Sequence, residues 1–186
     1  MDNWVKPKGK TARLVVTNEC VRNCTHCANK QKTPTKVIKD IYKDLMFYDE
    51  FVITGGEPML FAEKLDDFLW ELWNMAQRMV PPTKIYMYTA KVHDWKIIHK
   101  LLVRYLSGIT VTLHSEDDAA PFFRLNRELM ARGGWHGRSM RLHVFEGLDY
   151  NWAKLPIWNV KTVKWLKDCP VPDHEELCIL ENHWVN

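Results

Sequence analysis

Hydrophobic and polar positions along the chain follow two periods, which predict strands and helices in alternation. Short apolar, β-branched runs that end in turn residues are typical of buried strands. Six segments have this pattern: residues 12–18, 50–58, 84–90, 108–115, 139–147 and 158–166. Four segments between them have helical spacing: residues 33–47, 62–80, 94–106 and 119–134.

The helix expected over 62–80 has the clearest amphipathic pattern. Its apolar residues recur at three- and four-residue intervals on one side, as in a helix that packs on a sheet. They are Leu65, Phe68, Leu69, Leu72, Met75, Ala76 and Met79. Pro81 and Pro82 end this segment. Asp94 is placed to cap the next helix, and Gly133 with Gly134 to stop the last one.

Alternating strands and helices favour an α/β fold with a mostly parallel sheet and helices outside it. Right-handed crossovers would curl the six strands into an open, partial (βα)6 TIM-like barrel, because a closed eight-stranded barrel needs ~250 residues. We expect a single domain over 1–186, with the core over 11–166 and a C-terminal tail over 167–186. The segment 148–157 is too short and Pro-broken for a full helix, so we expect an irregular crossover there.

Composition is that of a globular protein, with 46% hydrophobic residues and a net charge of +3. Basic residues are scattered, which does not favour a nucleic-acid interface. No apolar run approaches the ~20 residues of a membrane span, and the N-terminal segment lacks the apolar core of a signal peptide. We therefore expect a cytoplasmic protein that does not bind membranes. Five cysteines, three of them clustered, favour a metal cofactor in reducing surroundings over disulfides.

The three clustered cysteines are Cys20, Cys24 and Cys27. They follow the first expected strand, and the glycine turn at 55–57 follows the second, so both lie at the carboxyl edge of the sheet, where ligands bind in such folds. Thiolates bind soft or borderline metals, and a [4Fe–4S] cluster normally takes four of them. With three, one iron would keep an open coordination site, which is how a metal holds a substrate for chemistry.

The spacing C-x3-C-x2-C of these residues resembles the signature of the radical S-adenosylmethionine (SAM) superfamily. The sequence Gly55-Gly56-Glu57-Pro58 resembles the GGEP motif of the same superfamily, in the expected order and interval. The resemblance implies a [4Fe–4S] cluster on the three cysteines and SAM chelated to the open iron. Reductive cleavage of SAM would then give a 5′-deoxyadenosyl radical that abstracts hydrogen from a substrate.

The resemblance also implies roles for residues around the motifs. Gly55 and Gly56 would let the backbone approach SAM, Glu57 would accept from its ammonium group, and Thr54 would add a hydroxyl nearby. His26 occupies the place where the family usually carries an aromatic residue against the adenine.

Polar residues at the ends of later strands are further candidates for cofactor binding. Tyr88 and Thr89 end the third expected strand. Ser115, and less directly His114, end the fourth and are candidates for contact with the SAM ribose. Arg124, on the following helix, is a candidate for the SAM carboxylate, although a solvated helix face is the ordinary role of such a residue.

Several alternatives remain open at this point. Cys20, Cys24 and Cys27 with a histidine would also suit zinc, so the competing hypothesis is a non-catalytic zinc or iron–sulfur binding module. Cys169 and Cys178 are expected to be free thiols, and His143 is only a weak site candidate.

The substrate and the catalytic residues do not follow from the motifs. The reaction implies an external electron donor of the flavodoxin or ferredoxin type. An open barrel must be covered during radical chemistry, and the tail, the segment around Trp152 and Trp158, a second copy of the chain or a protein substrate could do so. The last option resembles the small activases that install a glycyl radical on a partner enzyme, and nucleotide or peptide modification stays open.

Overall fold

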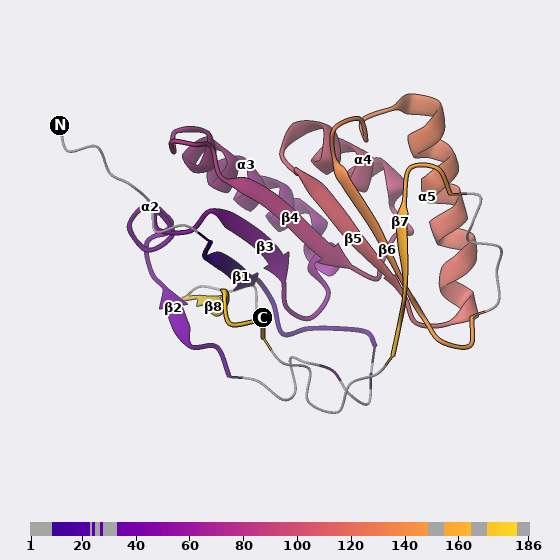
Figure 1. Ribbon diagram of the computed structural model, residues 1–186, viewed down its shortest axis with the longest axis horizontal. Helices are drawn as coiled ribbons and strands as arrows, with labels where there is room; N and C mark the ends of the chain where they lie inside the picture. The colour runs from indigo at the N-terminus through magenta and orange to yellow at the C-terminus, as the bar shows by residue number, and fades with distance from the viewer. Residues whose placement is uncertain are drawn as a thin grey trace.

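A computed structural model of the chain describes residues 9–22, 24, 27, 33–148, 155–164 and 171–181. Figure 1 shows a twisted sheet with helices packed against it. The described strands are β1 (Thr11–Val15), β2 (Lys36–Ile38), β3 (Glu50–Thr54), β4 (Lys84–Thr89), β5 (Gly108–Leu113), β6 (Ser139–Phe145), β7 (Asn159–Val163) and β8 (Glu175–Leu180). They form one sheet in the order β2-β8-β1-β3-β4-β5-β6-β7.

Every pair of neighbouring strands in this sheet is parallel. From β3 to β7, strands that follow one another in the sequence are also neighbours in the sheet, and β3 lies next to β1. The sheet is open, with β2 at one edge and β7 at the other. The α/β class and the open parallel sheet with helices are thus confirmed.

Three long helices supply most of the cover of the sheet. They are α3 (Ala62–Gln77), α4 (Trp95–Arg104) and α5 (Ala119–Arg132). The smaller helices are α2 (Ile41–Asp44), η1 (Pro58–Phe61) and η2 (Glu116–Asp118). The predicted cap at Asp94 is confirmed, because its carboxylate accepts from the backbone N–H of Ile97. Helix α5 ends at Gly133, whose φ of 76° is the left-handed conformation expected of a helix stop.

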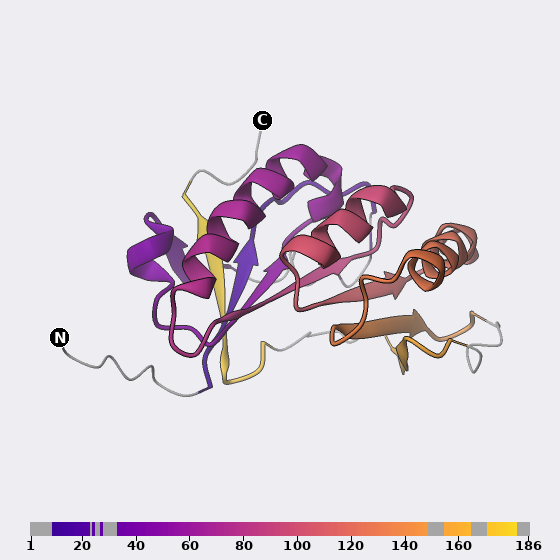
Figure 2. The same ribbon diagram turned by 90° about the horizontal axis from the view of Figure 1, so that it is seen from above.

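The three long helices lie on one face of the sheet (Figure 2). Strand β4 shows the consequence for its side chains: Ile85, Met87 and Thr89 are buried, whereas Tyr86 and Tyr88 are only half-buried. Within the described residues, no helix covers the opposite face. Parallel sheets are normally covered on both faces, so the uncovered face has room for another element or ligand.

The expected helix over 33–47 is wrong. Residues 36–38 form β2, and only 41–44 are helical, with Asp40 accepting from the N–H groups of Tyr42 and Lys43. The local spacing of apolar residues fitted a helix. However, pairing with β8 satisfies the backbone hydrogen-bonding groups of β2 instead.

Strand β8 lies within residues 167–186, for which the sequence predicts a tail outside the strand–helix repeats. It lies between β1 and β2 and pairs with both, for example Leu14 with Cys178. The sheet therefore has eight strands where six were expected. Within the described residues, none of the helices has the length and apolar character that a membrane crossing requires.

Candidate functional site

Backbone hydrogen bonds join the segment that follows β1 to the turn that follows β3. Gly56 N donates to Thr17 O at 2.6 Å, and Glu57 N donates to Glu19 O at 2.8 Å. Cys20 comes directly after Glu19. The start of the cysteine loop and the Gly-Gly-Glu turn are thus in contact at the carboxyl edge of the sheet.

The two glycines permit this close approach. A Cβ on Gly56 would overlap the carbonyl oxygen of Glu19 and lie 2.8 Å from the carbonyl carbon of Asn18. Gly55 has a φ of 123°, and a Cβ there would overlap Thr17 O. Only glycine fits at either position without moving the backbone.

The Glu57 carboxylate is buried, with 3% of the residue exposed. Oε1 accepts from Met59 N at 3.0 Å and from the Thr89 hydroxyl at 2.6 Å. Oε2 accepts from Ala90 N at 2.8 Å and from Lys91 N at 3.1 Å. A carboxylate has about four acceptor positions, so Glu57 ties the end of β3 firmly to the end of β4.

Cys20, Cys24 and Cys27 are free thiols on one loop. Burial raises the pKa of the Cys24 thiol, and the charges of Cys27 and Cys20 raise this pKa further, while Arg22 lowers it. Among the described residues, however, no group of three or more Cys, His, Asp or Glu side chains has an arrangement that could hold a metal ion.

Arg22 anchors the cysteine loop to the segment after β5. Its guanidinium forms a two-pronged ion pair with Asp118, with Nη1 donating to Oδ2 at 2.9 Å and Nη2 donating to Oδ1. Nη2 also lies 3.4 Å from the Ala90 carbonyl oxygen. Burial alone would raise the pKa of Asp118. The hydrogen bonds from Arg22, His114 and Ser115 outweigh that effect, so this pKa lies below its usual value.

His114 and Ser115 lie beside this ion pair. Their backbone N–H groups donate to Asp118 Oδ2 at 2.8 and 3.1 Å. The His114 ring stacks on Phe145, with centroids 4.9 Å apart. Burial, followed by the charge of Arg22, lowers the pKa of His114 to about 4. The imidazole is therefore neutral at pH 7.

Strand alternation separates Tyr88 from Thr89. Thr89 bonds to Glu57 and so joins the site, whereas Tyr88 lies under the Arg13 guanidinium, 5.5 Å from its ring centroid. Tyr88 also borders a cavity of about 390 Å³ with Thr11, Glu50 and other residues. Thr54 accepts from Val16 N through its backbone oxygen at 3.1 Å.

Two further candidates and the remaining cysteines lie elsewhere. Arg124 borders a separate cavity at the start of α4. His26 and Cys169 lie outside the described residues. Cys178 is buried, and its Sγ lies 3.8 Å from the Tyr48 hydroxyl.

Sequence reasoning missed the role of Arg22 and Asp118. Arg22 lies inside the cysteine motif but received no role. Asp118 stands three positions after Ser115, which is the spacing of a helix-capping pair and was the available signal.

Comparison with known protein-family models and with curated proteins gives no match to this chain.

Proposed function

We propose that the chain is a radical SAM enzyme, in which Cys20, Cys24 and Cys27 hold a [4Fe–4S] cluster. The observation that carries the proposal is the pair of backbone hydrogen bonds from Gly56 and Glu57 to the segment that enters the cysteine loop. Two motifs that are far apart in sequence thereby meet at the edge of the sheet where ligands bind in parallel α/β folds.

The donor set fits such a cluster. Three free thiols stand within eight residues of the sequence. Three cysteines leave one iron of a cubane open. When bound, the cluster would supply the electron that cleaves SAM to a 5′-deoxyadenosyl radical for hydrogen abstraction.

The chain's own residues would position and shield these groups. Gly55 and Gly56 would keep the backbone accessible to SAM. Glu57, the candidate for the SAM amino group, already has its acceptor positions filled by Met59, Thr89, Ala90 and Lys91, so its role here is to fix the turn. Arg22 holds the loop against Asp118. Among the strand-end candidates, Thr89, His114 and Ser115 lie around these anchors.

We further propose that the sheet is a partial barrel and that its uncovered face is closed in the working enzyme. The order from β1 through β3 to β7, with helices on one face, is compatible with a barrel interior on the other face. A second copy of the chain or a protein substrate would exclude water from the radical. Trp158 does not do so, because it packs against Phe122 of α5 with ring centroids 5.1 Å apart. The electron donor would be a flavodoxin-like or ferredoxin-like protein.

Anaerobic reconstitution tests the proposal directly. We expect about four irons per chain, and release of 5′-deoxyadenosine and methionine when the reduced protein is mixed with SAM. Replacing Cys20, Cys24 or Cys27 by Ala should remove the iron, whereas Cys178→Ala serves as the matched control and should retain it. Tightly held zinc, or iron without SAM cleavage, would favour the non-catalytic metal-binding module instead.

A further inference from the structure

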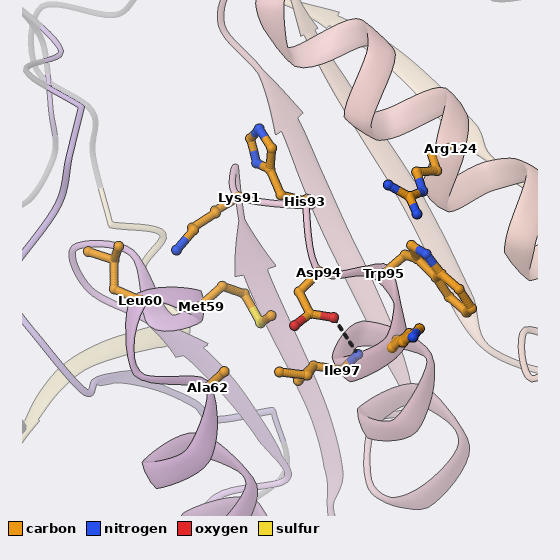
Figure 3. A pocket seen from close by; sticks show the side chains of 10 residues that line it. Met59, Leu60, Ala62, Lys91, His93, Asp94, Trp95, Ile97 and Arg124 are labelled. Carbon is orange, nitrogen blue, oxygen red and sulfur yellow. Dashed lines mark hydrogen bonds between the residues drawn. The ribbon is translucent and has the colours of Figure 1, made fainter.

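A cavity of about 600 Å³ lies on the helix-bearing side of the sheet, and two of its lining residues, Met59 and Lys91, donate backbone hydrogen bonds to Glu57. It is bordered by the start of α3, the loop from β4 to α4, and α5 (Figure 3). Its volume lies within the range of about 300–1,000 Å³ that small-molecule sites occupy. Its apolar wall comprises Met59, Leu60, Ala62 and Ile97.

Four basic side chains border this cavity: Lys91, His93, Lys96 and Arg124. Within the part of the chain that the structure describes, none of these four forms an ion pair. Other cations on the same two helices are paired, as Lys100 is with Asp66 and Arg132 with Glu128. The cavity thus concentrates positive charge that the protein itself does not neutralise.

Asp94 is the carboxylate at this cavity, and it balances only part of that charge. Asp94 is directed toward the first turn of α4, where its Oδ1 accepts from Ile97 N at 3.3 Å (Figure 3). The N-terminal turns of α3 and α4 both border the cavity, through Ala62 and through Trp95 to Ile97. Helix N-termini carry partial positive charge and bind phosphate readily. Asp94 caps α4, so it is the start of α3, which has no side-chain cap, that adds to the field of the four side chains.

We propose that this cavity binds a small, multiply charged anion of the phosphate class. Three fully charged cations and one histidine line this cavity. Together they carry more positive charge than one bound carboxylate would neutralise. Lysine, arginine and helix N-termini are the usual partners of phosphate oxygens in proteins. The apolar wall leaves room for an organic group attached to the phosphates.

The cavity also borders the candidate site through Lys91. Its side chain lines the cavity, while its backbone N–H donates to Glu57 Oε2 at 3.1 Å. A bound anion would therefore hold the loop on which Glu57 depends. The anion site itself does not rest on the radical SAM proposal, since a chain without iron should bind the anion equally well.

Calorimetric titration of the full chain with inorganic tripolyphosphate, at about 0.15 M ionic strength, tests the site. We expect saturable binding of one anion per chain. The double variant Lys96→Gln/Arg124→Gln should bind at least roughly ten-fold more weakly, because two charge-assisted contacts are lost. Both side chains are exposed, so the fold should be retained, and thermal unfolding of the variant checks this.

The matched control is Arg104→Gln/Arg127→Gln, which removes the same charge from exposed positions on the same two helices outside the cavity. It should bind tripolyphosphate within about two-fold of the unaltered chain, since long-range surface charges are screened. Absence of saturable binding, or equal weakening in both double variants, would overturn the site. Citrate binding as tightly as tripolyphosphate would overturn its assignment to the phosphate class.

Discussion

Arg22 and Asp118 form a two-pronged ion pair between residues 96 positions apart in the sequence. Asp118 is buried with 4% of its side chain exposed, and Arg22 is partly buried with 23% exposed. The pair fixes the cysteine loop, which follows β1, to the segment that follows β5. It is therefore a connection across the carboxyl edge of the sheet, over the strands β3 and β4 that lie between.

Arg22→Ala should lower the free energy of unfolding by about 1.5–3 kcal/mol, the scale of hydrogen bonds to a charged group. The cost arises because the Asp118 carboxylate stays buried without its charged partner. Urea unfolding of the metal-free chain measures it. The control Arg127→Ala removes an exposed arginine that lies 3.6 Å from Glu128 and should change stability by less than about 0.5 kcal/mol. Equal effects in both variants would contradict the anchoring role.

Gly56→Ala should disrupt the contact between the turn and the cysteine loop. The added Cβ would overlap the Glu19 carbonyl. Because the carbonyl belongs to the backbone, the overlap is relieved only when the two segments move apart. We expect the free energy of unfolding to fall by roughly 3 kcal/mol or more. We also expect the variant to lose iron after reconstitution. Gly137→Ala is the comparison, because a Cβ there meets nothing within 4 Å and only the φ of 71° is unfavourable. A Gly56→Ala chain as stable as Gly137→Ala would refute the steric argument.

Glu57→Ala should destabilise the chain by about 2–4 kcal/mol, because buried donors that now bond to the carboxylate lose their acceptor. Thr89→Val removes one of these donors and should cost about 1 kcal/mol. Unfolding and SAM affinity should be measured on both variants. If Glu57→Ala weakens SAM binding while stability stays unchanged, the residue contacts SAM without positioning the turn, contrary to our expectation.

Stability should fall between pH 7 and pH 5 because of His114. Its folded-state pKa of about 4 lies below the ordinary value of 6.5, so the unfolded chain takes up the proton first. The contribution of the neutral imidazole is present above pH 6.5 and is lost as the pH falls toward 4. Between pH 7 and pH 5, the free energy of unfolding of His114→Gln should fall by about 1–2 kcal/mol less than that of the unaltered chain. Identical pH profiles for the two proteins would show that His114 is not shielded in the folded state.

The sequence predicted the elements whose signals are local. Helix α3 was recognised from the spacing of Leu65, Leu69 and Leu72, all of which are fully buried. Strand β2 was not predicted, because a segment of three residues shows no periodic pattern. It forms a strand only by pairing with β8. Strand β8 in turn depends on β1, so neither could be found by reading a short window.

The candidate site stays a prediction, and strand alternation shows the limit of the rule behind it. The rule that polar residues at strand ends face the ligand found both Tyr88 and Thr89. It could not tell which of two successive side chains faces which side, and they point to opposite faces. Arg124 was a candidate for the SAM carboxylate, and it lines the cavity at the start of α4. The other cations there, Lys91 and Lys96, come from another loop and helix. Their grouping appears only once α4 and α5 are packed.

The position of β8 in the sheet affects how the chain folds while it is being synthesised. Strand β1 is synthesised early, yet one of its two partners is β8, whose Glu175 side chain accepts a hydrogen bond from Arg13, 162 positions away. During translation the edge of β1 therefore remains unpaired until nearly all of the described chain has left the ribosome. Contacts of such sequence separation slow folding, and an exposed strand edge can recruit other chains. Expression at reduced temperature, or with chaperones that shield nascent chains, should accordingly raise the soluble yield.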